Sequence, residues 1–384
     1  MMLRDLPLEG GPVEVRGALE LDRTPDGLLP RRLPAWTRAQ LPDVFMNTIV
    51  QMTSGVRLAF TTDSPAIELV VHPRTIHTVG SPFLPPVFQM VVDGAVQPDA
   101  VALGGSAVHV DRVAGPEGIT FEHGSAATLR WNDLGAQQKA VEIWFPTNAS
   151  VEIQALRVAT DAAVAATPVR SRRWTHYGSS ISHCVDVQRP FDAWPMQVAA
   201  ATGLELTSFG FGGQCQLDPF MGRVVRDHPA DVISLKLGIN LVNAGSMSQR
   251  TFTPAVHGLL DTIRDGQPRT PLLVVSPIFC PSCEAYPGPT VAGPDGMFDV
   301  VRAPKELRPF GLTLEWIREA LEFIVDARRA AGDHNLHYLD GLSLFGAADE
   351  PLLYDALHPS PAGYRLLGDR FAAAAFGPGA PLAG

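Results

Sequence analysis

Apolar residues in the first part of the chain come in short runs that cluster or alternate with polar residues. Glycine, proline, aspartate and asparagine interrupt these runs at close intervals, and we expect no helix among them. The runs are Val56–Phe60, Ile67–Val70, Phe88–Val92, Val141–Ile143 and Val151–Leu156. Short strands with frequent turn signals are typical of antiparallel sandwiches. The pattern therefore predicts an all-β sandwich domain, of the jelly-roll kind or similar, over residues 1–165.

The pattern changes after Arg172, where apolar runs alternate with segments of helical spacing. Buried strands are expected to start at Trp174, Leu204, Val232, Leu272 and His337. Helical spacing marks Pro219–Arg226, Ala255–Ile263, Leu312–Arg329 and Ala362–Ala375. Strands that alternate with helices predict a parallel sheet with crossover helices. We therefore predict a second domain, residues 166–384, of the α/β class with five parallel strands, and a boundary near Asp161–Pro168.

Composition and charge argue against two classes of protein, those that bind nucleic acid and those that span a membrane. A chain of 384 residues is too long for one ordinary core, which also favours two domains. The formal net charge of −10 argues against a nucleic-acid partner, because such proteins need a positive surface against phosphate. No apolar run reaches the roughly 18 residues that span a bilayer, and the first residues carry acids where an export signal has its apolar core. We expect a cytoplasmic protein that binds neither nucleic acid nor membrane.

The four cysteines lie in the second half, at positions 184, 215, 280 and 283. Cys280-Pro-Ser-Cys283 has the spacing of a redox motif or of half a zinc site. A complete zinc site needs a second such pair, which the two isolated cysteines do not make. The sequence also lacks a His-x-x-x-His pair with a supporting carboxylate. We expect free thiols and no bound metal, with a disulfide as the main alternative for the pair.

Polar or glycine-rich segments follow several of the expected strands. In open α/β sheets ligands bind beyond the carboxyl ends of the strands, so these segments are candidates for a site. They are His176–Ser182, Ser208–Gln214, Leu237–Asn240 and, late in the chain, Tyr354–Ser360. A long irregular stretch, Phe279–Gly311, follows the fourth strand, and loops of this length often serve as lids or substrate walls.

In this order the four segments resemble the signature blocks of the SGNH family, also called GDSL hydrolases, over roughly residues 172–376. The resemblance implies a flavodoxin-like sheet and an esterase, lipase, deacetylase or acyltransferase activity. The family's first block reads Gly-Asp-Ser, and aligning Gly178-Ser-Ser on it places the nucleophile at Ser180. Ser179 stands where the family has aspartate, so two adjacent serines are candidates.

The chemistry of the residues favours Ser180. A serine where a strand turns into a helix exposes its hydroxyl at the sheet edge, and its own N–H joins the positive helix terminus. His358 can act as the base that removes the hydroxyl proton, and Asp355 can orient the imidazole and stabilise its charged form. The spacing Asp-x-x-His-Pro matches the last block of the family. We predict Ser180, Asp355 and His358 as the catalytic triad.

Ser180, Gly213 and Asn240 are the predicted donors of an oxyanion hole, through two backbone N–H groups and one side-chain amide. Gly212 is an alternative for Gly213. Both glycines could also form a tight turn, and Asn240 could cap a helix. His176 and His183 flank the nucleophile, and we assign them structural roles.

A triad defines an acyl-enzyme but not the group that attacks it. Water makes an esterase, and an ordered alcohol makes a transferase. A β-sandwich before an SGNH domain, similar to a carbohydrate-binding module, occurs in secreted polysaccharide deacetylases and in some intracellular acyltransferases of natural-product pathways. The missing export signal favours the second group.

Resemblance to these acyltransferases implies that an aryl, salicylyl-like acyl group moves from a coenzyme A thioester to a hydroxyl of a tetracycline-type polyketide. No bound cofactor is implied, and acyl-coenzyme A is the expected donor substrate. The alternatives are an esterase or carbohydrate deacetylase, and a glycan binder through residues 1–165. The sequence carries no indication of an oligomeric state.

Overall fold

The computed structural model describes residues 2–80, 82–111, 118–170, 172–293, 295–302, 308 and 310–383. The chain divides into two compact units. Unit 1 comprises Met1–Val169 and Val185–Phe191, and unit 2 comprises Arg170–Cys184 and Asp192–Gly384.

The two units are not separated at a single point of the chain, because unit 1 consists of two separate segments. The segment Val185–Phe191, which comes shortly after Ser180 in sequence, belongs to unit 1. Two polar contacts hold it there: Arg189 pairs with Asp99, and the Phe191 N–H donates to Gln89 Oε1 at 2.9 Å. The return of this segment to unit 1 depends on contacts between residues far apart in sequence. A change in the pattern of apolar residues does not reveal such contacts.

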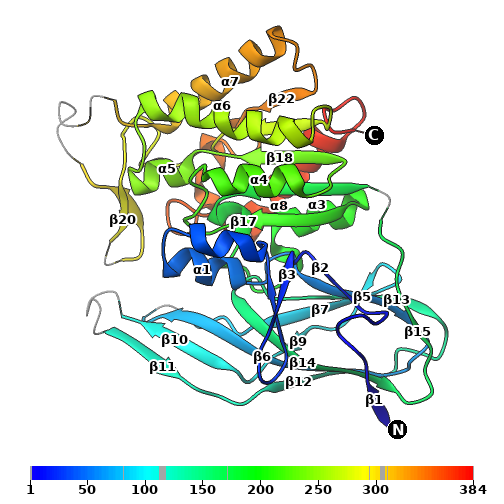
Figure 1. Ribbon diagram of the computed structural model, residues 1–384. Helices are drawn as coiled ribbons and strands as arrows, with labels where there is room; N and C mark the ends of the chain where they lie inside the picture. Colours follow the sequence, from blue (N-terminus) through cyan, green and yellow to red (C-terminus); the bar gives the residue numbers. More distant parts are fainter. Residues whose placement is uncertain are drawn as a thin grey trace. The chain divides into compact units, whose positions relative to one another are not determined.

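Two sheets build unit 1 (Figure 1). The first has the order β11-β10-β6-β14-β4-β3, with β1 beside β14 and β12 beside β6. Its strands are β1 (Leu3–Asp5), β3 (Glu20–Arg23), β4 (Leu28–Arg31), β6 (Ile67–Thr78), β10 (Ser106–Val110), β11 (Ile119–Glu122), β12 (Ala127–Trp131) and β14 (Ala149–Ala159). The second has the order β15-β5-β13-β7-β8, with β2 beside β5 and β9 beside β7. Its strands are β2 (Glu14–Arg16), β5 (Arg57–Thr62), β7 (Val87–Val92), β8 (Ala95–Val96), β9 (Ala100–Val101), β13 (Lys139–Trp144) and β15 (Val164–Ala165).

The two sheets share one hydrophobic core, as the predicted sandwich requires. Alternate residues of each strand point to opposite faces, so one apolar face of each sheet is available for burial. Leu58 and Phe60 of the second sheet and Leu69, Val71 and Ile153 of the first belong to the same buried cluster. Among the described strands of unit 1, β10 runs parallel to β6, and the other pairs are antiparallel. The predicted antiparallel arrangement is wrong for that pair.

Unit 1 also contains a helix that the strand pattern did not lead us to expect. Helix α1 (Val44–Gln51) follows a short 3-10 helix, η1 (Ala35–Gln40). Asp43 caps α1 by accepting a hydrogen bond from the Met46 N–H at 2.7 Å. Met46, Ile49 and Val50 are buried, at the i, i+3, i+4 spacing of one helical face. The expectation of no helix in this part was therefore wrong, although the local signals were present.

The predicted five-stranded parallel sheet of unit 2 is confirmed. Its order is β17-β16-β18-β19-β22, the flavodoxin-like arrangement. The chain runs from β16 outward to β17 and then crosses back to β18, so the strand order switches direction between β16 and β18. The strands are β16 (Arg173–Gly178), β17 (Glu205–Gly210), β18 (Val232–Lys236), β19 (Leu272–Val275) and β22 (Leu336–Leu339). Their carboxyl ends share one edge because all neighbouring pairs are parallel.

Helices cover both faces of this sheet (Figure 1). Helices α3 and α8 pack against each other, and α4, α6 and α7 form the other group of neighbours. The helices are α2 (Ser180–His183), α3 (Trp194–Thr202), α4 (Pro219–Asp227), α5 (Ile239–Ala244), α6 (Gln249–Gly266), α7 (Leu314–Ala330) and α8 (Pro361–Phe376). Short 3-10 helices are η3 (Pro190–Asp192), η5 (Gly341–Ser343) and η6 (Ala347–Leu352).

Aromatic packing fastens the first strand of unit 2 to its helices. Trp174 of β16 is fully buried and stacks on Phe371 of α8, with ring centroids 5.7 Å apart. Its ring also lies 6.3 Å from that of Trp194 in α3. Large rings bury much apolar surface with few rotatable bonds, so this cluster stabilises the strand that precedes Ser180.

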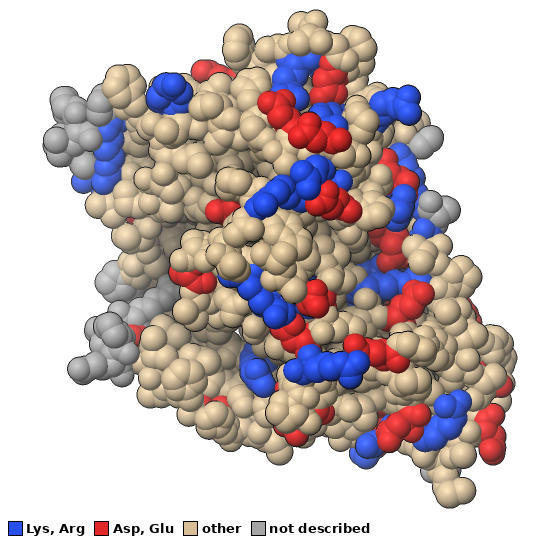
Figure 2. Space-filling model, in the orientation of Figure 1, with Lys and Arg blue, Asp and Glu red and all other residues tan. Residues whose placement is uncertain are grey.

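Charged side chains of both signs are interspersed over the face of the molecule that Figure 2 shows. This mixture agrees with the low basic content and the net charge of −10. Within the part of the chain that the structure describes, no helix is both long and apolar enough to cross a membrane.

Candidate functional site

Ser180 is the first residue of α2, immediately beyond the carboxyl end of β16. Its neighbour Ser179 caps this short helix, since the Ser179 hydroxyl accepts a hydrogen bond from the Ile181 N–H at 3.3 Å. A Cβ at Gly178 would collide with Ser182 Oγ, so the tight turn from strand to helix requires glycine there. The turn thus gives the two serines different surroundings, and Ser179 is wholly buried.

His358 lies on the segment that connects η6 to α8, and its ring joins Ser180 to Asp355. His358 Nε2 is 2.8 Å from Ser180 Oγ, and His358 Nδ1 is 2.7 Å from Asp355 Oδ2. The other carboxylate oxygen of Asp355 accepts hydrogen bonds from the backbone N–H groups of Leu357 and His358, at 3.0 and 2.6 Å. The structure therefore brings together the three residues predicted as a triad, and the histidine contacts Ser180.

The environment keeps Asp355 ionised. Burial by itself raises the pKa of this carboxyl, but the hydrogen bond and the charge of His358 oppose it, helped by the two backbone N–H groups. The net result is a pKa below the ordinary value of 3.8. An ionised Asp355 acts as an acceptor only, so it holds the proton of His358 on Nδ1 and leaves Nε2 to accept the proton of Ser180.

The two glycines of the second block, Gly212 and Gly213, differ in whether their backbone N–H is already hydrogen-bonded. The Gly212 N–H donates to His183 Nδ1 at 3.2 Å and is therefore already engaged. Gly213 has a left-handed φ of 71°, which favours glycine. Among the hydrogen bonds of the described residues, none uses the N–H of Gly213 or of Ser180. These two amides thus retain the donor capacity that the predicted oxyanion hole needs.

Asn240 is buried near the start of α5, and its side chain is oriented by a residue just after the second block. Its Oδ1 accepts a hydrogen bond from the Cys215 N–H at 3.0 Å, and its backbone carbonyl accepts one from Gln216 Nε2 at 3.1 Å. With the amide oxygen turned to Cys215, the amide nitrogen points the other way and remains a donor. Asn240 therefore contacts the two residues that directly follow the second block, close in sequence to Gly213.

Two aromatic rings flank His358, and the sequence analysis did not identify either. Phe298 packs edge-on against the imidazole at 5.7 Å between centroids, and Tyr354 stacks beside it at 6.1 Å. The Phe298 N–H also donates to the Asp355 carbonyl at 2.9 Å. The only signal for Tyr354 was its position directly before Asp355.

Phe298 belongs to a hairpin inside the stretch that was expected to be irregular. Strands β20 (Thr290–Ala292) and β21 (Phe298–Val300) pair antiparallel, and β20 contacts α5. Residues 294, 303–307 and 309 of the stretch lie outside the described part of the chain. The described hairpin is thus built against the loop that carries His358, while its role as a lid or wall stays a prediction.

His176 and His183, which flank Ser180 in sequence, have structural surroundings. His176 is fully buried, with Ser234 Oγ 2.7 Å from Nδ1 and Ser182 Oγ 2.8 Å from Nε2. Burial lowers the pKa of His176 from 6.5 to about 3, with a further contribution from the charge of Lys236. His183 accepts the Gly212 N–H and so ties the first block to the second.

The buried His176 makes stability depend on pH. Its folded pKa of about 3 lies below the unfolded value of 6.5, so the unfolded chain binds a proton that the folded chain does not, and stability is lost as pH falls from 6.5 towards 3. In His176→Gln we expect the slope of unfolding free energy against pH to decrease by about 1.4 kcal/mol per pH unit in this window. Denaturant unfolding at a series of pH values measures the slope, and an unchanged slope would contradict the assignment.

All four cysteines are free thiols, and all are buried. Cys280 and Cys283 lie side by side, with 3.2 Å between their sulfur atoms. Among the described residues no group of three His, Cys, Asp or Glu side chains is arranged to hold a metal ion.

This geometry belongs to a known class of enzymes. Residues 176–366 match the model of the GDSL-like lipase/acylhydrolase family. The chain carries a domain of that family and is a serine acyltransferase or esterase of the SGNH type.

Solved structures extend the likeness to the whole chain. The salicylyl-acyltransferase SsfX3 from a tetracycline biosynthetic pathway is 25% identical, with a TM-score of 0.78 over 96% of this chain and 95% of its own. A GDSL-like lipase from Bacteroides ovatus is 16% identical, with a TM-score of 0.67 over 96% of each chain. A family two carbohydrate esterase from Clostridium thermocellum is 14% identical, with a TM-score of 0.60 over 94% of this chain and 96% of its own. A search of curated protein sequences found no match.

Proposed function

We propose that this protein is an acyltransferase that moves an aryl acyl group from a coenzyme A thioester, through an ester on Ser180, to a hydroxyl of a tetracycline-type polyketide in the cytoplasm. The observation that carries the proposal is the hydrogen-bonded series Ser180–His358–Asp355. The choice of transfer over hydrolysis is supported by the 25% identity to a salicylyl-acyltransferase over nearly the whole chain.

Each residue of this hydrogen-bonded series has a defined role in the proposed reaction. His358 Nε2 takes the proton of Ser180 as the oxygen attacks the thioester carbonyl, and Asp355 stabilises the resulting imidazolium. Collapse of the tetrahedral intermediate breaks the carbon–sulfur bond, and coenzyme A leaves as a thiol that takes up the proton from His358. This leaves an acyl-serine and a neutral imidazole. The acceptor hydroxyl then attacks this ester while His358 removes its proton, and Ser180 is released on return of a proton.

The negative oxygen of each tetrahedral intermediate is assigned to the N–H groups of Ser180 and Gly213 and the amide of Asn240. Replacing Asn240 with alanine should lower kcat by about 10² to 10³ and change KM little, because this donor acts on charge that develops only in the transition state. Steady-state kinetics with an aryl thioester measures both constants. A rise in KM at unchanged kcat would instead assign Asn240 to ground-state binding.

The rings of Phe298 and Tyr354 beside His358 favour a flat, aromatic acyl group, since aromatic pairs gain energy beyond the area they bury. Phe298→Ala should lower kcat/KM for an aryl thioester by about fivefold to tenfold relative to acetyl-coenzyme A. Phe323→Ala, which removes an exposed ring of α7, is the matched control. Equal losses for aryl and acetyl donors would remove this argument for an aryl substrate.

A direct test compares donors and acceptors. The protein is incubated with salicylyl- and acetyl-coenzyme A, with and without a polyphenolic alcohol, while release of coenzyme A and the intact protein mass are followed. The proposal predicts a salicylyl adduct on Ser180 that persists until the alcohol is added. Release of coenzyme A at the same rate without the alcohol would show an esterase, which is the alternative that uses the same residues.

A further inference from the structure

Cys280 and Cys283 form a dithiol whose geometry defines which sulfur donates a hydrogen bond. Cys280 Sγ donates to the Ala356 carbonyl oxygen at 3.4 Å, which occupies its single proton. The contact of 3.2 Å between the sulfurs is therefore a hydrogen bond from Cys283 to Cys280. Disulfide bonds have a sulfur–sulfur distance of about 2.05 Å, so a small movement suffices to join the pair.

The acceptor of the Cys280 thiol belongs to the loop that carries the proposed base. Ala356 lies between Asp355 and His358 and has a φ of 66°, a left-handed value that non-glycine residues rarely adopt. Such a conformation persists only where the surroundings hold it. The thiol of Cys280 is one of the groups that hold this turn, across 76 positions of sequence.

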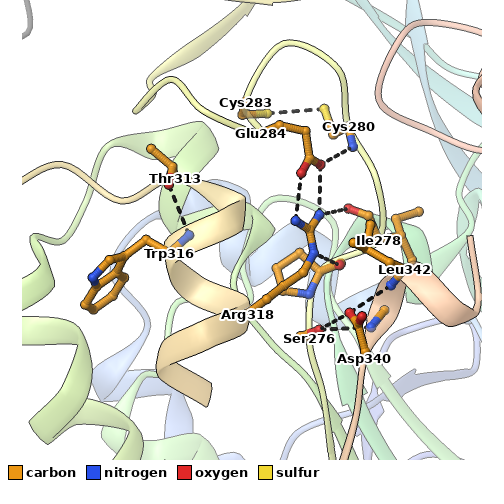
Figure 3. A network of polar contacts seen from close by, with 12 residues as sticks. Ser276, Ile278, Cys280, Cys283, Glu284, Thr313, Trp316, Arg318, Asp340 and Leu342 are labelled. Atoms are coloured by element: carbon orange, nitrogen blue, oxygen red, sulfur yellow. Dashed lines mark hydrogen bonds and ion pairs between the residues drawn. The ribbon is translucent and has the colours of Figure 1, made fainter. Parts of the chain in front are cut away.

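The segment of the dithiol is itself held rigidly (Figure 3). Glu284 Oε1 accepts the Cys280 N–H at 2.9 Å, and its carboxylate forms two bonds with Arg318 of α7, at 2.7 and 2.8 Å. Arg318 also donates to the carbonyls of Pro277 and Ile278, at 3.0 and 3.2 Å. This network fixes the backbone on both sides of Cys280, so a change at the sulfur is transmitted to Ala356 rather than absorbed by the loop.

Cys280 is also the more acidic thiol of the two. The hydrogen bond from Cys283 lowers the pKa of Cys280, although burial opposes it, and the same bond together with burial raises the pKa of Cys283. The thiolate is the reactive form of cysteine, so Cys280 is the sulfur that reacts first.

We propose that the Cys280–Cys283 pair is an oxidation site for hydroperoxides, and that its conversion to a disulfide slows acyl transfer by removing the hydrogen bond to Ala356. The oxidation stands on the dithiol alone, whereas the effect on rate rests on the proposed function.

The reaction balances as a two-electron exchange. The Cys280 thiolate attacks one oxygen of the hydroperoxide, the oxygen–oxygen bond breaks, and an alcohol or water leaves after taking up a proton. The sulfur of Cys283 then attacks the resulting sulfenic acid, the sulfur–oxygen bond breaks, and water leaves with the proton of Cys283. The two sulfurs are oxidised by two electrons, and the peroxide is reduced by two. The disulfide has no proton to donate to Ala356.

The test uses the reduced full-length protein, treated briefly with hydrogen peroxide and then with catalase. Peptide mapping after alkylation in denaturant should find residues 280 and 283 linked, with a peptide lighter by two hydrogen atoms. Hydrolysis of an activated aryl ester should be about fivefold to tenfold slower and recover with dithiothreitol, as expected for the loss of one positioning hydrogen bond. The pH profile of kcat/KM should also shift, because Ala356 lies on the turn between Asp355 and His358.

Two variants distinguish the loss of the Cys280 thiol contact from oxidative damage elsewhere in the protein. Thermal unfolding checks that each variant is folded. Cys283→Ala keeps the thiol of Cys280 and should match the reduced natural protein within about twofold before peroxide. After peroxide it stops at the sulfenic acid of Cys280, so peptide mapping should find no disulfide and an added oxygen on residue 280. Cys280→Ala lacks the donor and should show the slow rate of the oxidised protein in both conditions. A mapped disulfide without loss of rate, the absence of that disulfide, or a slow rate of Cys283→Ala before peroxide would each overturn the proposal. Reduced protein without turnover would instead contradict the proposed function.

Discussion

Ser180→Ala should abolish the acyl-enzyme and lower kcat for aryl thioesters by about 10⁴ to 10⁶, while the thermal unfolding temperature changes little. The hydroxyl is the atom that forms the ester, and no other hydroxyl among the described residues shares its contact of 2.8 Å with His358 Nε2. The remaining amide donors still stabilise an oxyanion for direct attack by water, so a residual rate above the uncatalysed reaction is expected. Burst kinetics and intact mass after exposure to an aryl thioester measure the loss.

Ser179→Ala is the matched control, because it removes the same group one residue earlier. Ser179 caps α2, so its loss should cost about 1 kcal/mol of unfolding free energy. Labelling of Ser180 by a fluorophosphonate probe should persist in this variant. If Ser179→Ala lost the label and Ser180→Ala kept it, the assignment of the nucleophile would be wrong.

Asp355→Asn should lower kcat by about 10³ to 10⁴ with a small change in KM. The carboxylate accepts the proton-bearing Nδ1 of His358 at 2.7 Å, and an amide at this position could present its NH2 group instead and turn the imidazole tautomer around. Single-turnover formation of the acyl-enzyme measures the effect on the chemical step. Asp340→Asn is the matched control, since Asp340 caps η5 through the Leu342 N–H and has no contact with His358 among the described interactions.

The same substitution has a consequence for stability. The folded pKa of Asp355 lies below the ordinary 3.8, so its contribution to stability is present above 3.8 and is lost as pH falls through the folded value. Asp355→Asn should therefore be less stable than the natural protein at neutral pH, and the difference should shrink in acid. A difference that stays constant with pH would mean that the carboxylate charge does not contribute.

The fold followed from local sequence in most of its parts. The five parallel strands of unit 2 start within a residue or so of the expected positions, because buried strands read as short apolar runs between helical segments. Helix α1 was missed although Asp43 and the spacing of Met46, Ile49 and Val50 signalled it, because the surrounding strands dominated the interpretation. The parallel pairing of β10 with β6 could not be predicted from the sequence, because the packing of segments far apart in the chain determines which strands pair.

The residues of the site also fall into those that the sequence predicted and those that only the structure revealed. The four blocks predicted Ser180, His358 and Asp355 as nucleophile, base and orienting carboxylate, because these are recognisable residue types near the ends of predicted strands, and the structure places the three side chains in hydrogen-bond contact. The hydrogen bond from the Gly212 N–H to His183 favours Gly213 as the free donor, and this contact is visible only in the folded chain. Phe298 lies in a stretch without a motif, and only the hairpin that presents it places its ring against His358.

By itself the sequence determined the two-part organisation, the class of each part and the residue types of an acyl-transfer site, because periodicity and short motifs are local properties of a chain. Tertiary structure alone decided that Ser180 lies in contact with His358, 178 positions away, and that the Cys280 thiol supports the loop of that histidine. Such contacts depend on strand order and on loop conformations that packing of the whole unit selects. They are therefore absent from any local stretch of sequence.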